Sequence, residues 1–220
     1  MNGLLGKKIG ATQIFTENGR LEPATLIEVG PCDIVQIKAD GKDGYSAVQL
    51  GFLDAKPKNV NKPAKGHFKS VTPKRYLREF RIDEAGIKDM KVGDRFSVDI
   101  FNKGDFVDIR GTSKGKGFQG GVRRWGFRGG PGGHGSMHHR APGSIGSSSF
   151  PSRVFKGQHL PGRMGGDTIT TQNLRILDID KENNLLTVKG AVPGHKDSLV
   201  VVTISKKKKR KGVSDGNTKA

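Results

Sequence analysis

The sequence has almost none of the features that several common classes of protein need. Its single cysteine, Cys32, cannot form a disulfide within the chain, which is typical of a protein kept in a reducing compartment. No run of about 18 apolar residues occurs, so we expect no membrane-spanning helix and no membrane partner. The N-terminus becomes charged at Lys7, too early for a secretory signal. These absences predict a cytoplasmic protein.

Apolar side chains are scarce as well. Hydrophobic residues make up 33% of the chain and aromatic residues 6%, whereas 33 of the 220 residues are glycine. The 39 Lys and Arg residues outnumber the 21 Asp and Glu residues, which gives a formal net charge of +18. A compact enzyme usually has more to bury and a charge nearer balance. The composition therefore disfavours an enzyme for a small neutral substrate.

Acidic residues are absent from one long central stretch. Residues 109–166 contain no Asp or Glu, yet they hold ten Lys and Arg residues and 17 of the glycines. The tail at 206–220 adds seven cations against Asp215 alone. A milder concentration lies at 56–81, with nine cations and Glu79. Most of the excess charge therefore sits in the central stretch and the tail, and the rest of the chain is nearly balanced.

The balanced parts have the patterns of short β-strands separated by tight turns. Turn signals such as Glu17-Asn18-Gly19 and the 40–44 segment separate runs rich in β-branched residues. The expected strands are Leu21–Val29, Ile34–Lys38, Tyr45–Phe52, Arg95–Phe101, Phe106–Arg110, Thr168–Asp180, Leu185–Val192 and Leu199–Ile204. They predict a mainly β fold with a small antiparallel β-barrel. The one helix expected is Thr72–Phe80, within the basic segment.

These patterns divide the chain into a body and two basic appendages. The predicted parts are the first part of the barrel body at 1–108, with a basic surface insertion at about 56–91, a long Gly- and Arg-rich loop at 109–166, the second part of the body at 167–205, and a basic disordered tail at 206–220.

The 109–166 loop has the composition of a segment that needs a polyanion. Its like charges repel and its glycines make ordering costly, so we expect the free loop to be extended and mobile. Phosphates would neutralise the charges and release counterions, which favours RNA as the partner. The predicted RNA-binding residues are Lys114, Lys116, Phe118, Arg123, Arg124, Trp125, Phe127, Arg128, His134, His138, His139, Arg140, Arg153, Lys156 and Arg163.

Two short motifs in this loop have competing interpretations. Gly115-Lys116-Gly117-Phe118-Gln119-Gly120 matches the G-x-G-x-x-G pattern of dinucleotide sites, but further glycines follow and no acidic residue appears before Asp167. His134, His138 and His139 could suggest a metal site, but no Cys, Asp or Glu is near them in sequence. We therefore expect no catalytic, cofactor-binding or metal-binding residue and no small-molecule substrate. The histidines are expected to stack on bases or donate to phosphates.

Trp125, the only tryptophan, has two possible roles that the sequence leaves open. It could stack on nucleotides between the arginines around it, or pack in a local cluster with Phe127 and Phe118. Both roles are compatible, because packed rings would fix the neighbouring arginines.

Several motifs, in order along residues 1–204, resemble those of the large-subunit ribosomal protein L-three family in its bacterial form. They are Gly3-Leu4-Leu5-Gly6-Lys7-Lys8-Ile9-Gly10, Gly115-Lys116-Gly117-Phe118 with Arg123-Arg124-Trp125-Gly126-Phe127, His134-Gly135-Ser136, His139-Arg140-Ala141-Pro142-Gly143-Ser144-Ile145-Gly146, Leu160-Pro161-Gly162-Arg163-Met164-Gly165-Gly166 and Val188-Lys189-Gly190-Ala191-Val192-Pro193-Gly194.

The resemblance implies a structural protein of the large ribosomal subunit with a translation-protein-type barrel. It implies binding to 23S-type rRNA, contact with neighbouring large-subunit proteins, early action in subunit assembly, and a loop that approaches the peptidyl transferase centre. Two features depart from the family. Ser147-Ser148-Ser149 stands where some bacterial members carry a methylated glutamine, and the 206–220 tail runs past the usual end.

Two other functions remain as alternatives at this point. The charge pattern would also suit a free RNA chaperone that is not built into a particle. A nucleotide-dependent enzyme that uses residues 115–121 is the second alternative, and titration with ATP or NAD would test it.

Overall fold

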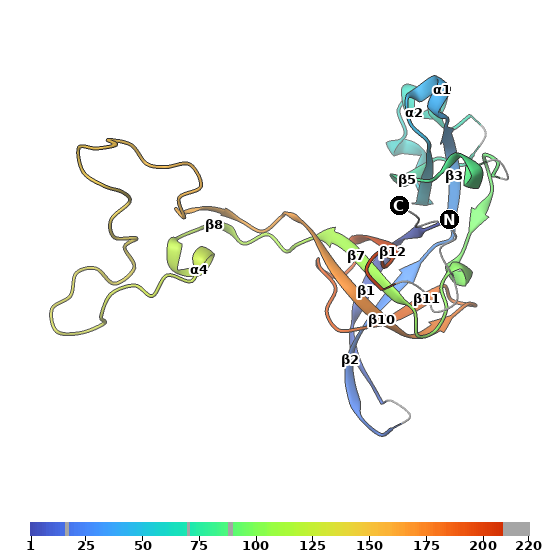
Figure 1. The fold of residues 1–220 in the computed structure, drawn as a ribbon. Helices are drawn as coiled ribbons and strands as arrows, with labels where there is room; N and C mark the ends of the chain where they lie inside the picture. The colour runs from blue at the N-terminus through green and yellow to red at the C-terminus, as the bar shows by residue number, and fades with distance from the viewer. Residues whose placement is uncertain (16–17, 70, 88–89, 209–220) are drawn as a thin grey trace, which may run out of the picture. The chain divides into compact units, whose positions relative to one another are not determined.

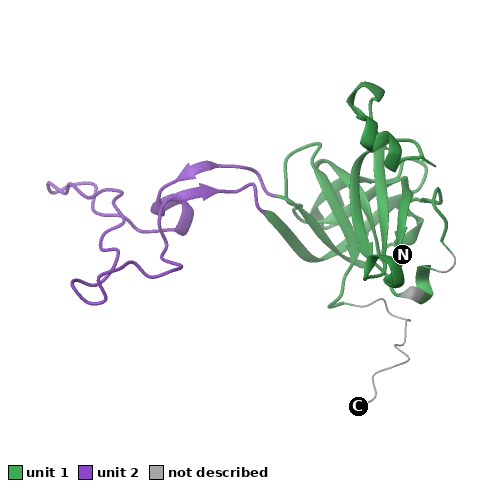
Figure 2. Cartoon of the chain, turned by 90° about the horizontal axis from the view of Figure 1, so that it is seen from above, with its two compact units in different colours: residues 1–112, 168–220 green, residues 113–167 purple. Residues whose placement is uncertain are grey.

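The structure is a computed structural model that describes residues 1–15, 18–69, 71–87 and 90–208. The chain divides into two compact units, which Figure 2 shows in green and purple. We call Met1–Thr112 together with the chain from Thr168 onward the barrel unit, and Ser113–Asp167 the loop unit. Among the described residues, no helix is long and apolar enough to cross a membrane.

The barrel unit is built around a closed barrel of six antiparallel strands, in the order β1-β12-β7-β10-β11-β2 (Figure 1). Their bounds are β1 Gly3–Phe15, β2 Leu21–Val29, β7 Phe106–Thr112, β10 Thr168–Asp180, β11 Leu185–Lys189 and β12 Leu199–Ile204. The prediction of a mainly β fold with a small antiparallel barrel is confirmed. Two parts of the sequence predictions lie outside the described residues. They are Glu17, the first residue of the expected turn at 17–19, and the part of the basic tail beyond residue 208.

Side-chain alternation explains why these segments form barrel strands. In β12, Val200 and Val202 are fully buried, whereas Val201 and Thr203 are only half-buried. A period of two places one set of β-branched side chains in the core and the other on the outer surface. The same closure pairs Thr112 at the end of β7 with Thr168 at the start of β10, so the loop unit leaves and re-enters the barrel at adjacent strands.

A second sheet of four strands, in the order β5-β4-β3-β6, completes the barrel unit. Its strands are β3 Cys32–Lys38, β4 Ala47–Asp54, β5 Lys74–Arg81 and β6 Arg95–Phe96. Two of the expected strands, Ile34–Lys38 and Tyr45–Phe52, therefore belong to this sheet and not to the barrel. The helices of this unit are short: α1 Asp40–Asp43, η1 Pro57–Asn59, α2 Lys62–His67, α3 Glu84–Ile87 and η2 Val98–Ile100.

The expected helix at Thr72–Phe80 was wrong, because most of this segment forms strand β5. It pairs with β4 in register, from Asp54 opposite Lys74 to Ala47 opposite Arg81. Phe80 is buried in the core, while its sequence neighbours Glu79 and Arg81 are exposed. A helix this short is only marginally stable, so pairing with the free edge of β4 decides the conformation.

The expected strand at Arg95–Phe101 was also too long. Only Arg95–Phe96 forms a strand, and the 3-10 helix η2 follows it. The turn buries Val98 and Phe101, and Ser97 donates a hydrogen bond to Asp99. Two apolar residues three positions apart lie on one face of a 3-10 turn, which is the spacing found here.

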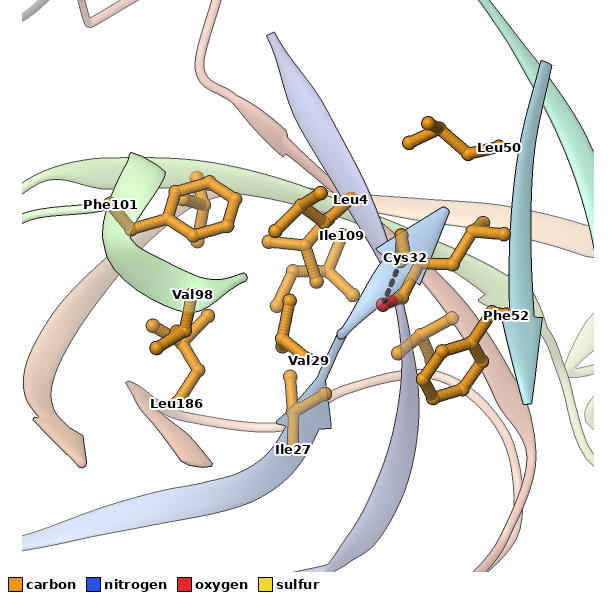
Figure 3. Close-up of a cluster of buried hydrophobic side chains, with 14 of the residues drawn as sticks. Leu4, Ile27, Val29, Cys32, Leu50, Phe52, Val98, Phe101, Ile109 and Leu186 are labelled. Atoms are coloured by element: carbon orange, nitrogen blue, oxygen red, sulfur yellow. Dashed lines mark hydrogen bonds between the residues drawn. The ribbon is translucent and has the colours of Figure 1, made fainter. Parts of the chain in front are cut away.

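One cluster of buried side chains joins the barrel and the sheet. Leu4 from β1, Ile109 from β7 and Phe52 from β4 are almost completely buried (Figure 3). Cys32 lies among them, and its thiol donates to the carbonyl oxygen of Leu5 at 3.5 Å. Burial raises the pKa of this thiol to about 12, so it stays protonated and unreactive.

The loop unit contains some regular structure of its own. Strand β8 Gly117–Gln119 pairs with β9 Gly162–Met164, and helix α4 Gly121–Trp125 follows β8. Figure 2 shows this hairpin and helix in purple, with an irregular chain that joins α4 to β9. The sequence patterns predicted no helix or strand between 111 and 166. These elements are short and lie in a segment rich in glycine and arginine, so they have no hydrophobic periodicity from which they could be predicted.

Candidate nucleic-acid interface

Hydrogen bonds close the base of the loop unit. The backbone amide of Ser113 donates to the carbonyl of Asp167 at 2.9 Å, and the amide of Asp167 donates to the Ser113 hydroxyl at 3.2 Å. The amide of Lys116 donates to the carbonyl of Met164 at 2.9 Å, just before β8 pairs with β9. The segment that enters the unit and the segment that leaves it are therefore held together by hydrogen bonds.

Helix α4 attaches to the returning chain through one carbonyl group. The Arg124 guanidinium donates to the carbonyl oxygen of Leu160 at 2.8 Å, and the indole Nε1–H of Trp125 donates to the same oxygen at 2.9 Å. A β-carbon at Gly162 would collide with the Arg124 guanidinium, so a larger residue there would force this flexible side chain to shift. Gly126 ends the helix in the left-handed conformation, with φ of 74°.

The rings of Trp125 and His159 extend this attachment. Their centroids lie 4.0 Å apart and their planes differ by 8°, which is a stacked geometry. On Trp125, the Arg124 guanidinium carbon also lies 4.9 Å from the ring centroid. We call the residues Arg124, Trp125, His159 and Leu160 the neck. The neck joins two segments that are far apart in sequence.

Beyond the neck, residues 127–158 form an irregular chain without helix or strand, which we call the apex. Close backbone contacts give it part of its path. The amide of Gly130 donates to the carbonyl of His139 at 3.2 Å, and a His139 ring nitrogen lies 2.8 Å from the carbonyl of Pro131. The carbonyl oxygens of His138 and His139 lie where β-carbons at Gly130 and Gly129 would stand, so the chains could not approach with larger residues there.

The predicted RNA-binding residues all lie in the loop unit. All of them are exposed except Arg124 and Phe127, which are half-buried. Phe118 is 76% exposed and lies directly opposite Arg163 in the β8–β9 pair. Arg153 lies over the ring of Phe155 at 5.5 Å. Aromatic surfaces and cations are therefore presented together, which is the combination that stacks on bases and contacts phosphates.

The cations of this unit have no anionic partners inside it. Ser113–Asp167, every residue of which the structure describes, contains Asp167 as its only acidic residue, and none of its Lys or Arg side chains forms an ion pair. The barrel unit differs, because some of its cations pair with acids, as Lys38 does with Glu79 and Lys189 with Glu22. The loop unit therefore has uncompensated positive charge that a polyanion could neutralise.

His134, His138 and His139 were expected to contact RNA and not to bind a metal ion. Across the described part of the chain, no three His, Cys, Asp or Glu side chains are grouped to hold a metal ion. His134, His138 and His139 are all exposed, and the ring of His139 is engaged by a backbone carbonyl.

Sequence reasoning missed the partner of Trp125. The expected local cluster paired this ring with Phe127 and Phe118, but the structure stacks it on His159. Phe127 instead lies against the backbone of Gly121, and Phe118 is exposed. His159 is next to a motif of the family resemblance, but no local spacing links it to a residue so far back in the sequence.

Sequence reasoning also gave no site in the barrel unit, where the structure has a cleft between β5 and the strands β7 and β12. Its volume is about 510 Å³, and Arg78, Arg110 and His195 line it together with Glu79 and Asp197. Lys7 hydrogen-bonds Asp197 at 3.0 Å, and this contact lowers the pKa of the carboxyl group. The basic residues at 56–81 were the only sequence signal for this region.

Known proteins are similar in sequence to this chain over both units. The sequence profile of ribosomal protein L3 matches residues 83–185, which include the whole loop unit. "Large ribosomal subunit protein uL3" from Desulforudis audaxviator is 54% identical over 202 residues, which cover 91% of this chain and 93% of that protein. The chain belongs to the ribosomal protein L3 family. It is a structural ribosomal protein and not an enzyme.

Other L3-family proteins match over a similar length. The uL3 protein of Carboxydothermus hydrogenoformans is 53% identical over 202 residues, with 91% of this chain and 95% of that protein covered. The uL3 protein of Natranaerobius thermophilus is 52% identical over 208 residues, with 94% of this chain and 98% of that protein covered. The family assignment therefore extends over the barrel unit and the loop unit alike.

Proposed function

We propose that this L3-family protein is a structural constituent of the large ribosomal subunit in the cytoplasm, and that its loop unit binds large-subunit rRNA. The relatives named above are large-subunit proteins, which supports the assignment of this chain to the large ribosomal subunit. The single observation that carries RNA binding is the exposed set of cations in Ser113–Asp167 with no ion pair inside the unit.

Different residues of the loop unit have different roles in this proposal. Exposed cations such as Arg123, Arg128 and Arg140 contact phosphates, and the glycines of the apex let the backbone pass close to RNA. Exposed rings such as Phe118 stack on unpaired bases. The neck contributes indirectly, because it fixes the direction of α4 and with it the direction of Arg123.

Salt dependence tests the RNA-binding proposal directly. If about six phosphates are neutralised, the log–log slope of affinity against salt should be near −5. Filter binding of the full chain to a large-subunit rRNA fragment, repeated at several KCl concentrations, measures this slope. A slope near zero would contradict the proposal, since neutral contacts release no counterions.

The finer part of the proposal concerns time and place. Following the family resemblance, we propose that the chain joins the subunit early in assembly and that its apex extends toward the peptidyl transferase centre, in contact with neighbouring large-subunit proteins. Crosslinking at nucleotide resolution from residues 115–165 tests the place. Quantifying the chain in precursor particles tests the time, and its absence from early precursors would refute that part.

A further inference from the structure

A cleft in the barrel unit brings cations and apolar side chains together. It lies between strand β5 of the second sheet and the barrel strands β7 and β12, and its volume is about 510 Å³. Every residue that lines it belongs to the barrel unit, so the cleft is a feature of this unit alone. Sites for small ligands usually have volumes of about 300 to 1,000 Å³. The cleft is therefore large enough for a small organic molecule.

Strand register places one side of the cleft on the outer face of the barrel. Val201 of β12 lies directly opposite Arg110 of β7, so their side chains are on the same face. Val200 and Val202 are fully buried, which places the face of Val201 and Arg110 outside the barrel core. Leu199 is on this outer face as well, two residues before Val201. This side of the cleft therefore combines an apolar surface with an exposed guanidinium group.

Strand β5 adds an aromatic ring and a second guanidinium group on the other side. The Tyr76 side chain is half-buried, and the guanidinium carbon of Arg75 lies 5.0 Å from the centroid of its ring. Arg78, two residues further along the strand, is exposed and lines the same cleft. Its guanidinium donates to the carbonyl oxygen of Leu77 at 2.8 Å. Tyr76 and Arg78 therefore face the apolar surface of β12 across the cleft.

The acidic residues of the cleft are already paired with lysines. The Asp197 carboxylate lies 3.0 Å from the Lys7 ammonium, and the Glu79 carboxylate lies 2.8 Å from the Lys38 ammonium. Hydrogen bonds from these lysines lower the pKa of both carboxyl groups, so both are ionised at neutral pH. Their charge is therefore compensated inside the protein.

The two arginines of the cleft are not compensated in this way. Neither Arg78 nor Arg110 forms an ion pair with any residue that the structure describes. Guanidinium groups bind phosphate oxygens strongly, because their N–H groups form a planar fork that matches the oxygens. The charges of the cleft therefore favour a ligand with a phosphate group.

The apolar lining favours a ligand that is more than a phosphate ion. Tyr76, Leu199 and Val201 offer a surface that inorganic phosphate would leave exposed to water. A nucleotide has both parts that the cleft can use, because its base is a flat ring that packs on aromatic and apolar side chains. The hydroxyl groups of Thr112 and Thr168, which lie opposite each other in β7 and β10, also line the cleft and can bond a ribose.

We propose that this cleft is a binding site for a single nucleotide. Its phosphate accepts hydrogen bonds from Arg78 and Arg110, and its base packs against Tyr76, Leu199 and Val201. An unpaired nucleotide of the rRNA and a free nucleotide offer the same phosphate and ring, so either is a source of this ligand. The rRNA source rests on the proposed place of the chain in the large subunit, whereas the site itself is separate from the loop unit.

Calorimetric titration of the full chain with AMP, and with inorganic phosphate, tests the site for a free nucleotide. AMP should bind more tightly than inorganic phosphate, and Arg78→Gln/Arg110→Gln should weaken AMP binding about tenfold or more. Arg81→Gln is the matched control. It removes the same charge from β5, but Arg81 is on the other face of the strand, over the Tyr45 ring at 5.4 Å. Thermal unfolding should be the same in all these variants, because no ion pair of Arg78 or Arg110 is lost.

Photocrosslinking in the ribosomal particle tests the site for an rRNA nucleotide. p-Benzoyl-phenylalanine replaces Tyr76 in the full chain, purified large subunits are irradiated, and reverse transcription maps the adducts. We expect an adduct at one rRNA position, and Arg78→Gln/Arg110→Gln should reduce its yield severalfold. The same probe at position 81 is the control and should not give this adduct.

The outcomes identify the source of the ligand or overturn the site. A single rRNA adduct that depends on the two arginines supports an rRNA nucleotide. AMP binding that depends on them, without such an adduct, supports a free nucleotide. If the double variant binds AMP as wild type does and position 76 gives no arginine-dependent rRNA adduct, the proposal is refuted. That result would leave the proposed function intact, because the salt slope of rRNA binding tests the loop unit. Absence of the chain from large subunits would count against the proposed function instead.

Discussion

The indole of Trp125 lies face to face with the imidazole of His159, and the carbonyl of the next residue, Leu160, accepts a hydrogen bond from the same indole. Stacking and hydrogen bonding at one point join the outgoing and returning chains of the loop unit. A segment without acids and with few apolar residues therefore still has a closed base. Order in this unit depends on a small set of specific contacts, because it has no apolar core.

The first prediction concerns this neck. In His159→Ala, Trp125 loses its stacking partner, so the neck should open more often in the free protein, by about two- to tenfold. Trp125 is the only tryptophan, so acrylamide quenching of its fluorescence reports on the neck alone. We expect stronger quenching in His159→Ala than in wild type. His134→Ala is the matched control, and equal quenching in both variants would show that the stack does not order the indole.

The second prediction separates two kinds of arginine. Arg123 and Arg128 are exposed, so replacing both with Ala should reduce the salt slope of RNA binding by about two and leave the fold unchanged. Arg124 is half-buried on the Leu160 carbonyl, so Arg124→Ala should also increase Trp125 quenching. Binding at several salt concentrations and quenching are measured on each variant. A change in the thermal unfolding of the barrel in Arg123→Ala/Arg128→Ala would contradict this division of roles.

The third prediction uses the buried thiol. Because burial raises the pKa of Cys32 to about 12, iodoacetamide should not modify the native chain at pH 8. In urea, the thiol should react at the rate of an ordinary cysteine. The extent of alkylation, measured by mass spectrometry across a urea series, should follow the unfolding of the barrel. Rapid modification without urea would show that the core around Leu5 and Phe52 opens locally.

The barrel could be predicted from sequence because its strands carry their own signals. Leu199–Ile204 and Leu185–Val192 are rich in β-branched residues and are bounded by turns, so local pattern and tertiary structure agree. Strand β1 gave no such signal, since glycines and Lys7-Lys8 interrupt it. The pattern of the 72–80 segment predicted a helix wrongly, because pairing with β4 outweighed its local preference for a helix.

The candidate site divides in the same way. Charge and glycine content depend on sequence alone, so the cations of the loop unit could be predicted from the order of residues. The stack of Trp125 on His159 depends on which segments meet in three dimensions. Single-sequence patterns report neighbours three or four residues apart on a helix and two apart on a strand, and residues 125 and 159 are much farther apart than that.

The fourth prediction concerns a buried ion pair in the second sheet, between Asp33 on the inner strand β3 and Lys74 on the edge strand β5. Asp33 accepts from Lys74 at 2.6 Å and from Arg95 at 2.9 Å, and the side chains of Asp33 and Lys74 are 6% and 7% exposed. Burial acts to raise the pKa of the Asp33 carboxyl, but the hydrogen bonds from Arg95 and Lys74 outweigh it, so the pKa is lowered. The folded state therefore favours the ionised carboxylate.

This lowered pKa fixes the direction of the pH dependence. An unfolded Asp has a pKa of about 3.9, so the contribution of Asp33 to the free energy of unfolding is complete above that pH. It is lost as the pH falls through the lower folded pKa. Between about pH 4 and pH 2, the free energy of unfolding should therefore fall more steeply in wild type than in Asp33→Asn. Urea unfolding followed by circular dichroism measures both curves.

At pH 7, Asp33→Asn should lower the free energy of unfolding by about 3 kcal/mol, because the buried Lys74 ammonium keeps only the exposed Asp54 as an anionic partner. Asp54→Asn is the matched control on the same lysine. Since the Asp54 side chain is mostly exposed, its loss should cost no more than about 1 kcal/mol. Equal effects of the two variants, or identical acid slopes for Asp33→Asn and wild type, would mean that burial does not distinguish the two carboxylates.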